Sequence, residues 1–242
     1  MLELHTEVID RLSDIGHVLV VGGVVRDLAF FGADERPIAD IDFVVTGRVR
    51  SLDLLARKLN AIPNRFGGYG LERGGFRVDF WSLHNTWAKK ELHAKVNTPR
   101  DLIKTTFFDW DAVVYDLSTS DIYAIPGYID KLHRRVIDIN LEPNPSIEGN
   151  LVRALRRIVM WDARPGPRLR RFLDANLHTV TWKRIVEAER GAFHVRYLDQ
   201  FHSSMDFKLR GLAKRNHGRI GIDDRRQTKF DFYVEGREQI KP

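Results

Sequence analysis

Two glycines and two aspartates near the start of the chain have the types and spacings that phosphate chemistry uses. Gly22 and Gly23 follow an apolar run, and Asp40 and Asp42 stand two residues apart in DIDFVV. Glycines at a strand-to-helix turn let the backbone approach a phosphate, and the helix N-terminus adds N–H groups and partial positive charge. Aspartates at i and i+2 of a strand share a face, about 6–7 Å apart, and carboxylate oxygens suit Mg²⁺. These residues outline a phosphoryl-transfer site.

Three predicted elements position these groups. An apolar strand over 17–21 runs into the glycine pair, a helix over 23–31 carries Arg26 and Asp27, and a strand over 40–45 carries both aspartates. Taken alone, each pair is a weak signal, because most glycine pairs are turns and alternating acids usually mark a strand with one solvent-exposed face. The order in which the glycines, the Arg-Asp pair and the two aspartates follow one another is a far more specific signal.

That order is GG-x-x-RD, a spacer of about a dozen residues, and D-x-D followed by two apolar residues. It resembles the head domain of class II nucleotidyltransferases, which include tRNA CCA-adding enzymes and bacterial poly(A) polymerases of the DNA polymerase beta superfamily. The resemblance covers about 18–82 firmly and extends to about 164. It implies that Asp40 and Asp42 bind Mg²⁺, with Mn²⁺ as the alternative, and that Gly22, Gly23 and Arg26 hold the triphosphate of an NTP.

A third carboxylate, Asp79, lies in FRVDFW on the second strand of a predicted hairpin. Alternation places it on the opposite face from Val78 and Phe80. By resemblance it is the third catalytic acid, which orients or deprotonates the attacking hydroxyl. Asp27 is expected to brace its turn or to pair with a basic residue.

Two motifs of the family are altered. Where class II enzymes carry Arg-Arg-Asp-Phe-Thr, this chain has TTFFDWDA over 105–112, so Asp109 or Asp111 is the candidate to replace the acid that contacts the ribose. Where CCA-adding enzymes select the base with an Asp and an Arg, the chain has Asn150 and Arg153, followed by Arg156. By resemblance these three residues lie near the nucleotide. Asn150 lacks the charge that would fix Arg153 in a bidentate pair.

The remaining pattern predicts an α+β fold, with strands and helices mixed over 1–140 and a helical, basic domain over 146–242. By resemblance, the first is a nucleotidyltransferase head with a small mixed sheet and the second is a neck-like domain. The Pro- and Asn-rich segment 140–146 separates them. Further helices are predicted at 2–14, 51–60 with Ser51 as cap, 99–104 after Thr98, 147–164, 168–176, 181–191 and 195–215, and strand pairs at 67–72 with 76–81 and at 112–117 with 121–125.

Composition narrows the classes of protein. The 242 residues are 43% hydrophobic and 30% charged, which allows a packed core. There is no cysteine, which excludes disulfides and thiolate zinc sites. No apolar run approaches the roughly 18 residues of a membrane span, and the acidic, amphipathic N-terminus does not resemble a targeting peptide. A cytoplasmic protein is therefore expected.

Charge is unevenly distributed. The whole chain has 39 Lys and Arg against 33 Asp and Glu, and residues 146–242 hold 21 against 12, which leaves 18 against 21 in residues 1–145. A basic half behind an acidic, carboxylate-bearing half suits a polyanion partner.

These observations predict a template-independent enzyme that moves a nucleotide from an NTP, ATP or CTP, to an RNA 3′ end, tRNA first among the acceptors. The chain is shorter than class II enzymes usually are, so either the basic half holds the RNA, or a homodimer partner helps, or the acceptor is not tRNA. A second interpretation keeps the chemistry with a protein or small-molecule acceptor. A third is a non-catalytic RNA-binding module.

Overall fold

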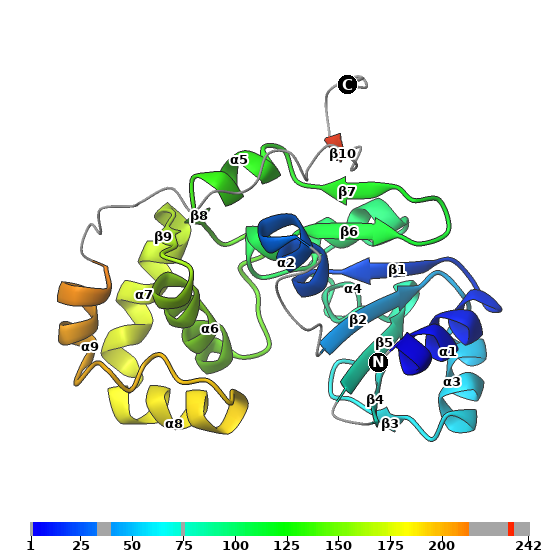
Figure 1. Cartoon of the computed structure of the whole chain (residues 1–242), viewed down its shortest axis with the longest axis horizontal. Coiled ribbons are helices and arrows are strands. Elements are labelled where there is room, and N and C mark those ends of the chain that lie inside the picture. The colour runs from blue at the N-terminus through cyan, green and yellow to red at the C-terminus, as the bar shows by residue number, and fades with distance from the viewer. Residues whose placement is uncertain (1, 33–39, 74–75, 213–231, 235–242) are drawn as a thin grey trace. The chain divides into compact units, whose positions relative to one another are not determined.

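The computed structural model of the chain describes residues 2–32, 40–73, 76–212 and 232–234. The chain divides into two units: residues 1–106, 110–128 and 222–242 form the first, and residues 107–109 and 129–221 form the second (Figure 1). The proposed boundary segment 140–146 lies inside the second unit. Pro37 and most of the basic C-terminal tail lie outside the described residues.

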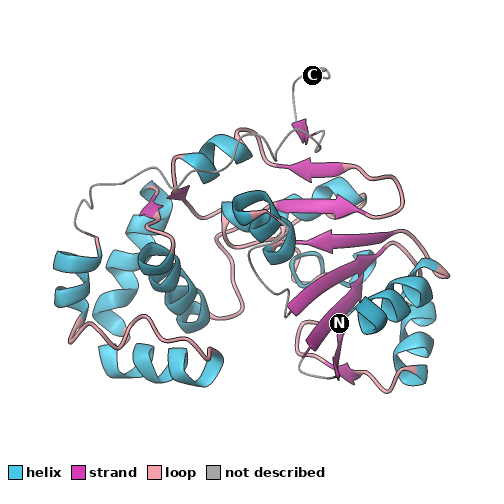
Figure 2. Cartoon of the chain, viewed as in Figure 1, coloured by secondary structure: helices cyan, strands magenta, loops and turns pink. Residues whose placement is uncertain are grey.

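The first unit is built on a mixed β-sheet, which has eight strands within the described residues (Figure 2). The strands are β1 (Val18–Val21), β2 (Asp40–Val45), β3 (Ile62–Pro63), β4 (Tyr69–Arg73), β5 (Phe76–Ser82), β6 (Val113–Asp116), β7 (Ile122–Ala124) and β10 (Phe232–Val234). Their order is β10-β7-β6-β1-β2-β5-β4-β3. β2 is parallel to β5 and β7 to β10, and the other neighbours are antiparallel.

Helices alternate with these strands. They are α1 (Leu2–Ser13), α2 (Gly23–Phe31), α3 (Val49–Lys58) and α4 (Trp87–Lys90), with 3₁₀ turns η1 (Leu83–Asn85), η2 (Pro99–Lys104) and η3 (Asp109–Asp111). α1 packs against α3 and β1, and α2 contacts β1, β2 and β6. The predicted cap of η2 is confirmed: Thr98 and Asp101 form a reciprocal capping box with Pro99 in the first turn.

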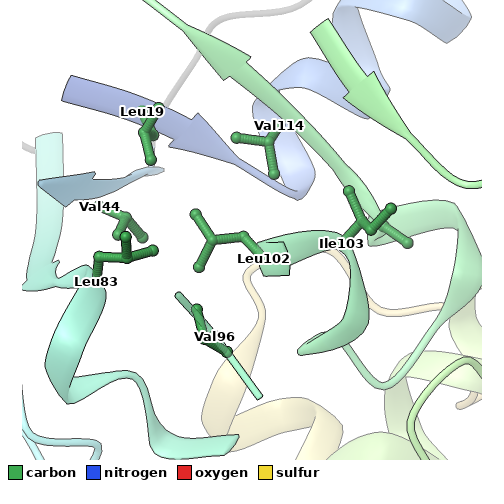
Figure 3. Packing of buried hydrophobic residues seen from close by; sticks show 8 residues of the cluster. Leu19, Val44, Leu83, Val96, Leu102, Ile103 and Val114 are labelled. Atoms are coloured by element: carbon green, nitrogen blue, oxygen red, sulfur yellow. The ribbon is translucent and has the colours of Figure 1, made fainter. Parts of the chain in front are cut away.

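An apolar cluster fixes the strand that carries the two aspartates. Val44 of β2 packs with Leu19 of β1 and Val114 of β6 (Figure 3). Five more side chains complete the cluster: Leu83, Val96, Leu102 and Ile103 from the segments after β5, and Ala112 from the residue before β6. Because Val44 shares a strand face with Asp42, this face of β2 is apolar at one end and carboxylate-bearing at the other.

The second unit is mainly helical. Its elements are α5 (Tyr128–His133), which begins at the end of the first unit, β8 (Val136–Ile137), α6 (Ile147–Met160), β9 (Arg164–Pro165), α7 (Pro167–Thr179), α8 (Trp182–Ala192), α9 (Ser204–Asp206) and the π-helical turn η4 (Phe207–Gly211). α6 packs against α7 and α8, and β8 pairs with β9 in parallel. The predicted α+β class, a mixed-sheet part and a helical part, is confirmed.

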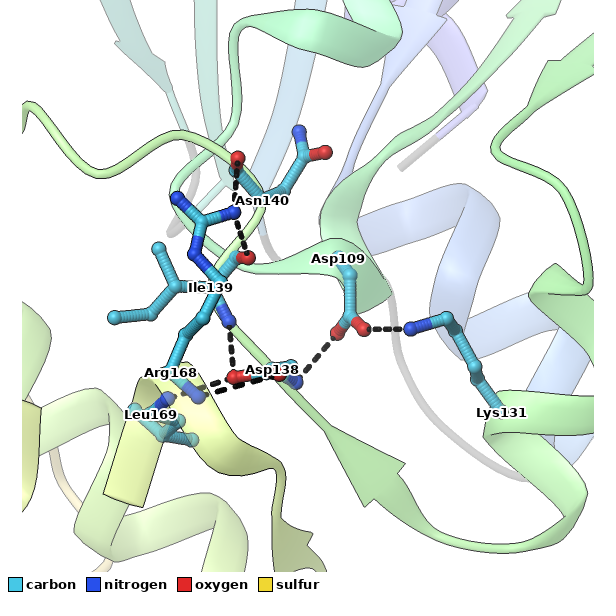
Figure 4. Close-up of polar contacts among 7 residues, drawn as sticks. All are labelled: Asp109, Lys131, Asp138, Ile139, Asn140, Arg168 and Leu169. Atoms are coloured by element: carbon cyan, nitrogen blue, oxygen red, sulfur yellow. Dashed lines mark hydrogen bonds and ion pairs between the residues drawn. The ribbon is translucent and has the colours of Figure 1, made fainter. Parts of the chain in front are cut away.

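Asp138 anchors the start of α7. Its carboxylate accepts hydrogen bonds from the backbone N–H groups of Leu169 at 2.6 Å and Ile139 at 2.9 Å (Figure 4). Arg168 donates to the carbonyl of Ile139 at 3.0 Å. Gly166 lies directly beside this carboxylate, and a Cβ added there would stand 2.5 Å from Asp138 Oδ2.

Three predicted helix boundaries are wrong. The helix placed at 51–60 begins at Val49 after Arg48, so Ser51 is not its cap. The helix placed at 147–164 ends at Met160, because Asp162 adopts a φ of 53° that a helix cannot continue through.

The third concerns the helix placed at 195–215: of its described residues, 195–212, those in α9 and η4 alone are helical. The backbone N–H groups of Tyr197 and Leu198 donate to the carboxylate of Glu189 instead of to helix carbonyls.

No helix in the described part of the chain is long and apolar enough to cross a membrane.

Candidate active site

The turn between β1 and α2 requires glycine at position 22. Gly22 has φ 69° and ψ −116°, a conformation open to glycine and strained for residues with a Cβ. Its N–H donates to the carbonyl of Val113 at 3.0 Å, and its carbonyl accepts from the N–H of Arg26 at 3.0 Å. Gly22 therefore ties β1 to the start of β6 and caps α2 through its backbone.

Gly23 is the first residue of α2 and has no such requirement. A Cβ added there would meet only the guanidinium of Arg26, at an ordinary 3.6 Å. No side-chain hydrogen bond caps α2, and the first N–H groups of any α-helix lack acceptors within the helix. The N-terminus of α2 thus has free backbone donors and no bulky side chain, as a phosphate-binding site requires.

Arg26 is buried, with 7% of its surface exposed. Its Nε donates to Asp27 at 2.8 Å, and its Nη1 forms an ion pair with Asp111. Burial alone would lower the pKa of Arg26, but the charges of Asp111 and Asp27 outweigh burial and raise that pKa above its ordinary value. The pairing expected for Asp27 is confirmed. A contact between Arg26 and a triphosphate stays a prediction, and the guanidinium already binds two carboxylates.

The three candidate carboxylates share one face of two adjacent strands. Asp42 of β2 is paired in register with Asp79 of β5, and Asp40 is paired with Arg77. The residues between them point to the opposite, buried face: Ile41 and Phe43 on β2, and Val78 and Phe80 on β5. The alternation predicted for Asp79 is confirmed, and it places the Asp79 carboxylate next to that of Asp42.

The glycine turn and these carboxylates lie at the same end of the sheet. β1 runs antiparallel to β2, so the turn at the end of β1 lies beside the start of β2, where Asp40 and Asp42 stand. β6 is also antiparallel to β1 and begins just after Asp111. A Cβ at Gly22 would lie 3.9 Å from the Cβ of Asp111. Gly22, Asp111 and the aspartates of β2, which are far apart in sequence, thus lie together at one end of the sheet.

Asp79 is held by neighbouring side chains. Arg77 donates to it twice, Nε at 2.8 Å and Nη2 at 3.2 Å, and Asn64 Nδ2 lies 3.4 Å from Oδ1. The hydrogen bond with Asp79 raises the pKa of Arg77, the charge of Asp79 adds to this, and Asp40 contributes in the same direction.

The donor set fits a hard divalent cation. Asp40 is exposed and Asp42 half-buried, so both carboxylates are accessible to a hydrated ion. Among the described residues, no group of three or more Asp, Glu, His or Cys is gathered tightly enough to enclose a metal. Mg²⁺ commonly uses one or two carboxylates and completes its shell with water and substrate phosphates. Asp40 and Asp42 suit that arrangement.

The structure separates the two aspartates proposed to replace the missing acid. Asp109 is buried in the second unit, where Lys131 donates to it at 2.7 Å and the N–H of Asp138 at 2.8 Å (Figure 4). Burial raises the pKa of Asp109, and Lys131 partly opposes this. Asp111 lies at the glycine turn of the first unit. Of the two, only Asp111 stands at the candidate site.

The residues predicted to lie near the nucleotide belong to α6 of the second unit. Asn150 is buried and Arg153 is exposed, and Arg153 Nη1 lies 3.5 Å from Asn150 Oδ1. This distance is the outer limit of a hydrogen bond. The single, long contact agrees with the expectation that Asn150 does not fix Arg153 in a bidentate pair.

Arg156, predicted by resemblance to lie near the nucleotide, is buried. Its Nη1 donates to Glu189 at 2.5 Å and to the carbonyl of Val195 at 2.6 Å, and its guanidinium lies 3.9 Å from the ring centre of Phe193. Arg157 is likewise buried, over the ring of Phe108. The carboxylate of Glu189 and the aromatic rings stabilise these guanidinium charges in the interior of the unit. The nucleotide contact predicted for Arg156 remains untested.

Sequence reasoning missed Arg77 and Glu189. Arg77 stands two residues before Asp79 on the same strand, so alternation alone places both side chains on one face. Glu189 gave no such signal, because its partner Arg156 is 33 residues away in the chain.

Comparison with known proteins establishes the fold. No protein-family model matches the chain, and no curated protein matches it. Among solved structures, a tRNA-processing enzyme in its apo form is 24% identical, with 76% of this chain and 50% of that chain covered and a TM-score of 0.52. A Thermotoga maritima CCA-adding enzyme complexed with tRNA is 22% identical, with 80% and 45% covered and a TM-score of 0.51.

A third solved structure, a tRNA nucleotidyltransferase with a primer tRNA and an incoming ATP analogue, is 21% identical, with 73% and 52% covered and a TM-score of 0.50. The chain spans about half the length of these proteins. The resemblance seen in the sequence is confirmed at the level of the fold: the chain shares the fold found in tRNA nucleotidyltransferases.

Proposed function

We propose that the chain is a template-independent nucleotidyltransferase that moves a nucleoside monophosphate from an NTP to the 3′-hydroxyl of an RNA. The observation that supports this most is the convergence of the Gly22 turn with Asp40, Asp42 and Asp79 at one end of the sheet. The fold shared with tRNA nucleotidyltransferases supports the same reaction.

Each group has a defined task in this reaction. The N-terminus of α2 binds the triphosphate through backbone N–H groups and the helix dipole, and Arg26, through its ion pairs with Asp27 and Asp111, holds that end of the helix in place. Asp40 and Asp42 hold Mg²⁺, or Mn²⁺, which when bound neutralises charge on the phosphates. Asp79 orients the attacking hydroxyl. The oxygen of the RNA 3′-hydroxyl forms the new bond to the α-phosphorus, and the bond from the α-phosphorus to pyrophosphate breaks. The hydroxyl proton passes to a carboxylate or to water.

The substrates follow from the same reasoning. CTP, an ATP analogue and tRNA are bound in the solved structures of similar fold, and we propose ATP or CTP as donor and a tRNA-like RNA as acceptor. The positive balance beyond residue 146 suits RNA phosphates, which makes binding sensitive to salt. We place this activity in the cytoplasm.

A labelling experiment tests the proposal. The protein is incubated with Mg²⁺, each α-labelled NTP in turn, and either total RNA or lysate protein. Label is expected in RNase-sensitive species, and Asp42→Asn is expected to abolish it. If Asp40→Asn and Asp42→Asn both transfer nucleotide at the wild-type rate, the metal assignment is wrong. If none of the labelled NTPs binds in the presence of Mg²⁺, a non-catalytic RNA-binding module is favoured.

A second acceptor class is supported by one observation, the long contact between Asn150 and Arg153. Loose selection of the base suits an enzyme that modifies a protein or a small molecule, in which case label appears on species that resist RNase. The variant Asn150→Asp distinguishes the RNA acceptor from this second acceptor class. If α6 selects the base, the restored charge is expected to fix Arg153 and change the ratio of ATP to CTP use, measured as kcat/KM for each. An unchanged ratio would favour the second acceptor class.

A further inference from the structure

Asp79, the third carboxylate of the site, contacts neighbouring side chains through both of its oxygens. Both of its oxygens accept from the guanidinium of Arg77, at 2.8 and 3.2 Å, and Asn64 approaches Oδ1 at 3.4 Å. A forked, two-bond contact fixes the orientation of a carboxylate as well as its charge. Asp79 is thereby oriented toward Arg77.

The strand register places Arg77 among all three acids. Arg77 is paired with Asp40 across the two strands, two residues along from the pair formed by Asp42 and Asp79 on the same face. Three neighbouring carboxylates repel one another unless a cation lies among them. Arg77 supplies a cation, and the rise in its pKa, due first to its hydrogen bond with Asp79 and in a smaller part to Asp40, reflects that position.

The next strand leaves room for this pair. Gly70 of β4 is in register with Asp79, and a Cβ added to it would stand 3.0 Å from Asp79 Oδ1 and 3.7 Å from Arg77 Nη2. The first distance is tighter than an ordinary contact. Glycine at this position therefore accommodates the pair against the sheet.

We propose that Arg77 is a positioning residue that keeps Asp79 out of the metal site, so that without nucleotide a divalent ion is held by Asp40 and Asp42 alone. This inference rests on the proposed function. Arg77 acts in two ways: it occupies the oxygens of Asp79, and its charge repels a second cation. Weak binding of the free ion favours its arrival together with the nucleotide, whose phosphates complete the coordination shell.

Removal of Arg77 is therefore expected to strengthen metal binding. A unit charge about 6 Å from a divalent ion in water-like surroundings changes the binding constant on the order of tenfold. Arg77→Gln removes that charge and also frees Asp79 as a third oxygen donor. Structural damage at the site would weaken binding, so a gain of affinity separates positioning from a purely structural role.

The test is a Mn²⁺ titration of the full chain without nucleotide, in which the free ion is followed by electron paramagnetic resonance. Arg77→Gln is expected to lower the Kd for Mn²⁺ about tenfold. Asp79→Asn alone leaves the charge of Arg77 uncompensated and is expected to weaken Mn²⁺ binding, and adding it to Arg77→Gln is expected to remove most of the gain. Arg65→Gln, an exposed arginine of the same unit, is the matched control and is expected to change nothing.

The outcomes separate this inference from the proposed function. If Mn²⁺ binding depends on Asp40 and Asp42 but Arg77→Gln leaves it unchanged or weaker, the role of Arg77 is refuted and the metal site stands. If Asp40→Asn and Asp42→Asn do not affect Mn²⁺ binding, the metal site and the role of Arg77 both fail. Circular dichroism and thermal melts confirm that each variant is folded.

Discussion

The guanidinium of Arg26 is shared between Asp27 and Asp111, and Asp111 lies 85 residues further along the chain. This ion pair joins α2 to the segment that leads into β6. It also brings Asp111 against the Gly22 turn. The helix whose N-terminus is proposed to bind a phosphate is thus anchored by a buried charge pair in its first turn.

The anchor predicts a large loss of stability when only one partner is removed. Arg26→Met leaves the carboxylate of Asp111 without its cation and is expected to lower the free energy of unfolding by about 3–5 kcal/mol. Urea denaturation followed by circular dichroism measures the loss. The double variant Arg26→Met/Asp111→Leu removes both charges and is expected to recover most of the stability. A double variant as unstable as the single one would show that the pair is not the cause.

The two glycines of the turn predict different effects. Gly22→Ala forces a residue with a Cβ into φ 69°, and we expect a loss of about 1–3 kcal/mol in unfolding free energy. Gly23→Ala adds a Cβ with only ordinary contacts, so stability is expected to stay within about 0.5 kcal/mol, as for an unstrained site. Both variants are compared by urea denaturation. Equal losses would contradict the assignment of the strained position.

For the Gly23→Ala variant, the same protein sample is then tested for binding of Mg-ATP by calorimetry. Its methyl group crowds the helix end where the phosphate is proposed to lie. Weaker binding with unchanged stability is expected, and unchanged binding would place the phosphate elsewhere.

Asp109 predicts a pH dependence of stability. Burial raises its pKa in the folded protein above the ordinary value of 3.8, so the folded state holds this proton to higher pH than the unfolded state does. Stability from this group is therefore greatest below pH 3.8 and falls as pH rises through the raised pKa. Asp109→Asn removes this titration. The wild type is expected to lose stability relative to Asp109→Asn as pH rises from about 4, and a change in the opposite direction would contradict it.

Glu189 predicts local unfolding within the second unit. Its carboxylate accepts from Arg156 and from the N–H groups of Tyr197 and Leu198. Glu189→Ala leaves Arg156 buried without its partner and is expected to cost about 3–5 kcal/mol. Hydrogen exchange measured by mass spectrometry should show faster exchange over 193–203. Glu187→Ala, at an exposed position of the same helix, is the control and should change neither quantity.

Local pattern was enough to predict the elements around the site. The helix at 23–31 and the strand at 40–45 were predicted with the bounds that the structure shows, because a glycine turn and an apolar alternation mark their ends. The face of Asp79 followed from the same alternation. These features depend on residues within a few positions of one another, which a single sequence reveals.

Pairings over long distances in the chain were not predictable in this way. The burial of Arg156 was not predictable, because nothing near it in sequence indicates its partner Glu189. The choice between Asp109 and Asp111 depended on which unit each joins. The engagement of Asp79 by Arg77 depends on the space above Gly70, a residue of another strand.

Gly166 and Asp138 carry a consequence for the evolution of this fold. The carboxylate that anchors α7 occupies the space that any side chain at position 166 would need. Position 166 is therefore not free to change while Asp138 is present. Among related chains we expect covariation: glycine at 166 wherever an acid stands at 138, and larger residues at 166 only where that acid has been lost and α7 begins with another cap.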